Sequence, residues 1–164
     1  IKKTLEDQKQ EDYDSTLKSE AWQAVVDNTT VQKYSKKQQE KIDEMKNSLI
    51  DSYKSYAESM GTDYETYITS SGQYTVESFE QKVEEAAEES EKQTMIAEAI
   101  ADKENIKLDN KTYKKMLKEY AKTYNFEDGA AMEEAYTKDT LKEAMIADLV
   151  KDWLADNCIQ KTDN

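Results

Sequence analysis

The sequence has no histidine, which removes the serine, cysteine and zinc sites whose chemistry depends on an imidazole. Glycine occurs only at Gly61, Gly72 and Gly129, so there is no glycine-rich loop for holding phosphates. The single cysteine, Cys158, excludes an intrachain disulfide. No stretch approaches the run of about 18 apolar residues that predicts a membrane span. These absences exclude most catalytic classes, and we expect no cofactor and no metal.

Proline is absent as well, while Lys, Glu, Gln, Ala, Met and Leu are frequent, so the local preference is helical nearly everywhere. The sequence therefore predicts an all-α fold. Apolar spacing and stop signals place the helices at about 2–26, 35–60, 62–71, 75–104, 109–124, 127–136 and 138–158. In the last helix, Leu149, Val150 and Trp153 lie on the broadest apolar face, and we expect them to hold the core.

Cap residues support several of these boundaries. Ser35 and Asp109 are expected N-caps, and Thr62 with Glu65 three residues later has the pattern of a capping box. Thr75 should cap the long helix, but Ser78 stands where a capping box has Glu or Gln, so we expect a simple cap there.

Charge narrows the choice of partners. The chain carries 36 acidic and 23 basic residues, a formal charge of -13, which repels nucleic-acid phosphates. No nucleic-acid partner is therefore expected, and the acidic surface favours basic or neutral polypeptides. The first half of the first helix is nearly all polar and gains little from packing. We interpret residues 1–20 as a connector from a missing upstream domain, within a single helical module that spans 1–164.

Tyrosine and methionine are in excess, with eleven Tyr and six Met. Tyr offers a flat apolar face with a polar tip and Met is flexible, so together they suit surfaces that accept varied apolar partners. Many of them can equally well pack helix against helix, but the bend after Gly61 is a natural exposed tip. The candidate binding residues on and around this bend are Tyr56, Met60, Tyr64, Tyr67, Ile68, Tyr74 and Phe79.

The chain also contains an internal echo. The segment 53–61 (YKSYAESMG) aligns with 117–125 (LKEYAKTYN), and a short helix followed by a long one is expected after each. Gly61 and Asn125 can both adopt positive φ, so the two helices should end by the same mechanism. The pattern fits a duplicated unit of helix, turn, short helix and long helix, although similar helical composition would give the same pattern.

Three segments in this order resemble the C-terminal domain of bacterial trigger factor: AIADKENIKL at 99–108, YAKTY at 120–124 and WLADN at 153–157. Upstream, Met60-Gly61, Tyr67, Gly72 and the run VESF at 76–79 fit the same family. The resemblance implies an elongated helical body with arm-like hairpins, similar also to SurA-type chaperone modules. It further implies an ATP-independent chaperone that binds unfolded or nascent polypeptides, here called clients, in the bacterial cytoplasm.

The sequence departs from the family by lacking a proline before the second long helix. It also contains no FKBP-like domain or ribosome-docking loop, so we expect no prolyl isomerase activity from these residues. Two other interpretations stay open: the helical substrate-binding part of a larger FKBP-type isomerase, or a structural coiled-coil-like adaptor. An extracytoplasmic lipoprotein of a Gram-positive bacterium and a homodimer are left open as well.

Overall fold

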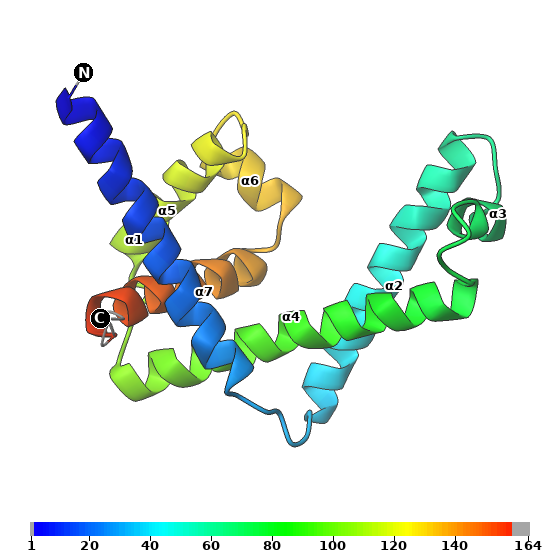
Figure 1. Ribbon diagram of the computed structural model, residues 1–164, viewed down its shortest axis with the longest axis horizontal. Coiled ribbons are helices and arrows are strands. Elements are labelled where there is room, and N and C mark those ends of the chain that lie inside the picture. The colour runs from blue at the N-terminus through cyan, green and yellow to red at the C-terminus, as the bar shows by residue number, and fades with distance from the viewer. Residues whose placement is uncertain (1, 159–164) are drawn as a thin grey trace. The chain divides into compact units, whose positions relative to one another are not determined.

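The computed structural model of the chain describes residues 2–158, and these form seven α-helices without a strand (Figure 1). The all-α class is thus confirmed. The helices are α1 (Lys2–Asp27), α2 (Lys36–Ser59), α3 (Tyr64–Thr69), α4 (Val76–Glu104), α5 (Asn110–Thr123), α6 (Gly129–Ala135) and α7 (Lys138–Asn157). The long helix predicted at 75–104 is present as α4. The elongated form of the whole remains a prediction.

The predicted caps at Ser35 and Asp109 are confirmed. The N–H of Gln38 donates to Ser35 Oγ at 3.4 Å and the N–H of Ser35 donates to Gln38 Oε1 at 2.7 Å, which completes a capping box. At α5 the N–H of Thr112 donates to Asp109 Oδ1 at 2.7 Å. This bond to the charged carboxylate lowers the pKa of Asp109.

Two other caps differ from expectation. The cap of α3 is Asp63, not Thr62, because the Asp63 carboxylate accepts both the N–H of Thr66, at 2.9 Å, and its hydroxyl, at 2.8 Å. At α4 the expected simple cap is wrong: Ser78 N–H donates to Thr75 Oγ1 at 3.1 Å, and Thr75 N–H donates back to Ser78 Oγ at 3.0 Å. Serine therefore takes the place that Glu or Gln has in a capping box.

The internal echo reappears in how α2 and α5 end. Gly61 has φ +74° and Asn125 has φ +58°, so both helices stop at a residue with left-handed backbone. A six-to-one hydrogen bond closes each turn, from Thr62 N–H to the Ala57 carbonyl at 3.1 Å and from Phe126 N–H to the Ala121 carbonyl at 2.8 Å. A buried alanine thus accepts the closing bond in both turns.

The chain divides into two compact units. Unit 1 comprises Ile1–Thr30 and Thr94–Asn164, and unit 2 comprises Val31–Gln93, so α4 contributes residues to both. In unit 1, α1 packs along α7. Wherever its side chains are described, α1 is exposed from residue 6 to residue 16 and becomes partly buried at Leu17. The poor packing expected of its first half is confirmed, whereas its role as a connector stays a prediction.

Two clusters of buried side chains form the core of unit 1. The first joins α1, the end of α4 and α7, and consists of Trp22, Val26, Ile96, Ala97, Ala101 and Val150. The second joins α5, α6 and α7, and consists of Tyr113, Leu117, Ala121, Met132, Leu141 and Met145.

Of the three residues expected to hold the core, Val150 is fully buried, but Leu149 and Trp153 are only half-buried. The core tryptophan is Trp22, with 7% of its surface exposed. The expectation that Leu149 and Trp153 hold the core together with Val150 was therefore wrong, because α7 turns Val150 inward and leaves the other two partly in solvent.

Tyr113 gives unit 1 a pH dependence that can be measured. Burial and a 2.7 Å hydrogen bond from its hydroxyl to Glu133 Oε1 raise the pKa of Tyr113 to about 12. The neutral phenol is favoured in the folded state, so its contribution is fully present below the ordinary pKa of about 10 and is lost as pH rises toward 12. In this window we expect the ionisation of Tyr113 to lower the free energy of unfolding by at most about 1.4 kcal/mol per pH unit.

Urea denaturation between pH 8 and pH 11.5 checks this, with Tyr113→Phe as the non-titrating control. Above about pH 10 the parent should lose stability more steeply than the variant. Parallel curves would show that Tyr113 titrates alike in the folded and unfolded chains.

Candidate functional site

Five aromatic rings meet at one end of unit 2, where Figure 1 shows α3 beside the end of α2 and the start of α4. This ring cluster consists of Tyr53, Tyr56, Tyr67, Tyr74 and Phe79. Tyr53 is its centre, with ring centroids 4.9 Å from Phe79 and 6.5 Å from Tyr67. The ring centroid of Tyr56 lies 5.5 Å from that of Tyr67, and the ring centroid of Tyr74 lies 5.9 Å from that of Phe79. Most of these pairs are edge-on, the arrangement that aromatic quadrupoles favour.

Local structure brings the rings together. Tyr53 and Tyr56 are three residues apart and so share one face of α2. The Asp63 cap starts α3 so that Tyr67 meets both of them, and the Thr75–Ser78 cap places Phe79 at the start of α4. The ring cluster therefore depends on two capped helix starts that follow closely on the Gly61 turn.

Polar contacts hold α2 and α3 against α4. Lys46 Nζ lies 2.6 Å from Glu84 Oε2, and this ion pair joins α2 to α4. The Tyr64 hydroxyl donates to Glu80 Oε1 at 3.4 Å, so Tyr64 ties α3 to α4. Burial, together with the nearby Glu80 charge and this hydrogen bond, raises the pKa of Tyr64. Tyr64 is thus a half-buried structural contact as well as a candidate binding residue.

The predicted residues gather at this end of unit 2, but they are not equally accessible. Met60 and Tyr56 are 64% and 51% exposed, and Tyr74 is exposed too. Tyr64, Tyr67 and Phe79 are half-buried. Ile68 is buried, with only 5% of its surface exposed, so the expectation that it lies on an exposed tip was wrong. The six-residue helix α3 lies against α2 and has room for one inward face, which Ile68 occupies.

Sequence reasoning missed three members of this surface. Tyr53 is not among the seven predicted residues, yet it is the hub of the ring cluster. Met45 and Leu49 are not among them either, and both are exposed on α2. The signal that could have found them is the narrower set Ile42, Ile50 and Ala57, spaced eight and seven apart, which forms the buried face of α2.

The exposed apolar residues of α2 form a line. Met45, Leu49, Tyr56 and Met60, here called the α2 stripe, are spaced four, seven and four residues apart and fall within about 60° of one helix face. The stripe is about 23 Å long at 1.5 Å per residue. It shares Tyr56 with the ring cluster, so unit 2 carries exposed apolar side chains both along α2 and around the rings.

Unit 1 has a smaller aromatic surface. Tyr124 and Tyr136 are exposed and flank a hollow of about 280 Å³ whose lining includes Tyr120 and Met132. The Tyr120 hydroxyl donates to the Asp148 carboxylate, and burial together with this bond raises the pKa of Tyr120. None of the seven candidates lies in unit 1.

Within residues 2–158 no three His, Cys, Asp or Glu side chains are grouped so that they could hold a metal ion. No helix in that range is both long and apolar enough to cross a membrane. Unit 2 exposes flat phenol rings and flexible thioethers. Side chains of these types suit reversible apolar contacts that are weak one by one.

A family model described as the bacterial trigger factor protein C-terminus matches residues 1–159. No curated protein and no solved structure matched the chain.

Proposed function

Because the chain belongs to the bacterial trigger factor C-terminal family, a family of chaperone modules, we propose that it holds unfolded or nascent polypeptides without ATP. The holding surface in this proposal is the ring cluster together with the α2 stripe. One observation carries it: Tyr56, Met60 and Tyr74 are large apolar side chains left in solvent around a cluster of aromatic rings. Large apolar side chains grouped in solvent in this way are typical of interaction sites.

The chemistry suits weak and varied binding. Tyr rings give contact area with little loss of side-chain entropy, and Met adapts to the shape of its partner. A chain that binds the unfolded state delays collapse and aggregation by mass action alone, without hydrolysis or a covalent step. The net charge of -13 keeps a complex with exposed apolar segments soluble. In keeping with bacterial trigger factor, we place this activity in the cytoplasm.

The test replaces Tyr56, Met60 and Tyr74 by Ser in one variant. Exposed substitutions shift stability by only about 0.5 kcal/mol each, so the melting temperature should change little. Suppression of the aggregation of a chemically denatured test protein, followed by light scattering, should weaken clearly. Ile68 and Tyr67 are left intact because the first is buried and the second joins two ring pairs.

The matched control replaces Tyr13, Tyr124 and Tyr136 by Ser, which removes the same number of exposed large side chains from unit 1. This control should suppress aggregation nearly as well as the parent. An equal loss of activity in both variants would contradict the location of the site, and full activity in the unit 2 variant would contradict the proposed surface itself.

A further inference from the structure

One face of α5 carries a line of lysines. Lys111, Lys115, Lys118 and Lys122, here called the α5 lysine face, are spaced four, three and four residues apart and are all exposed. This spacing keeps them within about 60° of one side of the helix, over a length of about 17 Å. The opposite side of α5 carries the buried Tyr113, Leu117 and Ala121. Packing therefore fixes the direction in which the lysines point.

The concentration of positive charge is out of keeping with the rest of the chain. The α5 segment NKTYKKMLKEYAKT holds five lysines and a single acidic residue, whereas acidic residues outnumber basic ones over the whole sequence by 36 to 23. Lys111 and Lys115 are four residues apart, as are Lys118 and Lys122. Like charges at this spacing destabilise a helix.

The described part of the chain does little to neutralise this face. Lys115 Nζ lies 3.8 Å from Glu119 Oε1, a weak pair because both side chains are exposed. No ion pair within residues 2–158 involves Lys111, Lys118 or Lys122. Elsewhere lysines are paired along the helix, as in Lys54–Asp51 and Lys142–Asp139. The lysine face is thus a local conflict of the kind that marks functional surfaces.

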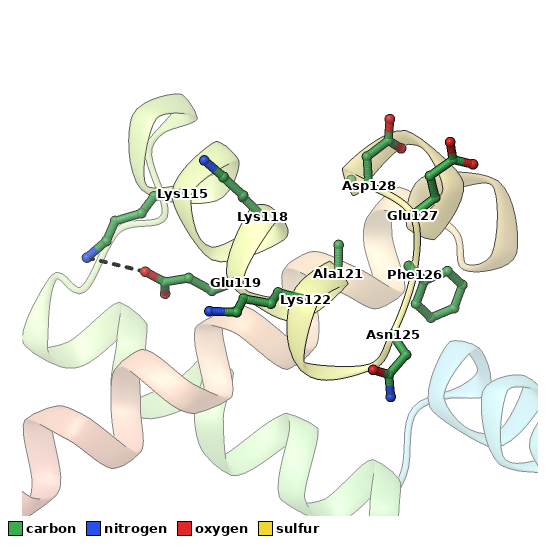
Figure 2. A pocket seen from close by; sticks show the side chains of 10 residues that line it. Lys115, Lys118, Glu119, Ala121, Lys122, Asn125, Phe126, Glu127 and Asp128 are labelled. Atoms are coloured by element: carbon green, nitrogen blue, oxygen red, sulfur yellow. Dashed lines mark ion pairs between the residues drawn. The ribbon is translucent and has the colours of Figure 1, made fainter.

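A hollow of about 1150 Å³ adjoins the lysine face at the C-terminal end of α5. Figure 2 shows Lys118 and Lys122 projecting from α5 on one side of it, and Phe126 on the loop at the other. Ala121 and Gly129 also contribute to the lining, while Glu127 and Asp128 stand at the far rim. Asp128 is already engaged, since it caps α6 by accepting the N–H of Ala131 at 2.9 Å. The hollow is therefore lined on the α5 side by three lysines together with Glu119, which pairs with Lys115, while Ala121 and Phe126 add apolar surface and the two acidic residues of the loop stand opposite.

We infer that the α5 lysine face and this hollow bind an acidic polypeptide segment. Its carboxylates would lie against the lysines, and one apolar side chain would enter the hollow beside Phe126. An extended segment of about five residues matches the length of the face at about 3.3 Å per residue. The lysine face favours an acidic partner, whereas the acidic remainder of the chain favours basic or neutral polypeptides. The inference therefore goes beyond the proposed holding of clients by unit 2.

Charge also favours a peptide over a long polyanion. Screening confines electrostatic effects to about 8 Å at physiological salt, so a short acidic segment on the lysine face is largely shielded from distant carboxylates. A nucleic acid that extends beyond the face would run over a strongly acidic surface and be repelled. The acidic peptide therefore fits the length and the charge of this site together.

The experiment measures binding to the intact chain of a fluorescein-labelled decapeptide of Asp and Glu with one central Phe, by fluorescence anisotropy at low and at physiological salt. The test variant replaces Lys111, Lys115, Lys118 and Lys122 by Gln, which retains helix propensity. Loss of four exposed charge contacts should raise the Kd about tenfold or more. The parent's affinity should fall as salt increases. Circular dichroism must show equal helix content in the variant and the parent.

The control variant replaces Lys9, Lys33, Lys37 and Lys107 by Gln, four exposed lysines outside α5 with the same total change in charge. Its Kd should stay within about twofold of the parent, because distant charges are screened. The Ser variant at Tyr56, Met60 and Tyr74 should bind the peptide as the parent does, which separates this proposal from the holding function.

Equal weakening in both lysine variants would overturn the site, as would a parent that shows no binding of the peptide. Tighter binding of a single-stranded RNA or of vesicles of anionic lipid, lost in the α5 variant, would overturn the assignment of an acidic polypeptide as partner.

Discussion

Replacing Trp22 by Ala is expected to lower the free energy of unfolding by about 3 to 5 kcal/mol, the usual cost of removing a large buried aromatic ring. Trp22 lies in the first core cluster with Val26 and Val150, and these residues bring α1 and α7 together. Lys151 Nζ lies 5.5 Å from the Trp22 ring, so a cation–π contact is lost as well. Urea denaturation followed by circular dichroism measures the change.

Trp153→Ala is the matched control, because it makes the same chemical change at a half-buried position. Its cost should be clearly smaller, since partial exposure means that less apolar area leaves the interior and solvent can fill the space. A loss at Trp153 equal to that at Trp22 would show that the two rings contribute alike and would contradict the core as described.

Met145→Ala should cost about 2 to 5 kcal/mol by leaving a cavity in the second core cluster. Met145 is fully buried among Tyr113, Leu117 and Leu141, where helices α5 and α7 meet. The same change at Met45, on the exposed α2 stripe, should shift stability by only about 0.5 kcal/mol. Thermal melts of the two variants provide the comparison. Similar melting temperatures would mean that α5 and α7 gain little from packing on Met145.

The helix boundaries could be predicted from the sequence because the signals that set them are local. Ser35 and Asp109 cap their helices through side chains within three residues of the N–H groups that they accept, and Gly61 ends α2 through its own φ. The predicted start of α3 was wrong because two capping signals overlap in the sequence. Thr62 with Glu65 has a capping-box pattern, but Asp63 offers a charged acceptor to the same turn.

Burial was less predictable, because it depends on which helix faces meet. Trp22 and Trp153 both belong to apolar stripes, and the sequence alone does not show which of them the α1–α7 contact covers. Ile68 and Tyr67 are neighbours in a six-residue helix, yet one is buried and the other half-exposed. A helix of this length has too few turns for its periodicity to define a buried side. The candidate residues do gather at one end of unit 2, but the sequence did not separate the exposed members from the buried ones.

The matching turns at Gly61 and Asn125 separate backbone architecture from surface chemistry. In each turn the buried alanine and the left-handed residue end the helix, and neither feature involves the outward side chains of that helix. The alignment places Lys122 opposite Glu58 and, extended by two residues, Lys115 opposite Asp51, so two equivalent outer positions carry opposite charge, whereas Lys118 and Lys54 are both basic. The same turn thus ends two helices whose outer surfaces differ, and a change of outward side chains leaves the hydrogen bonds of the turn in place.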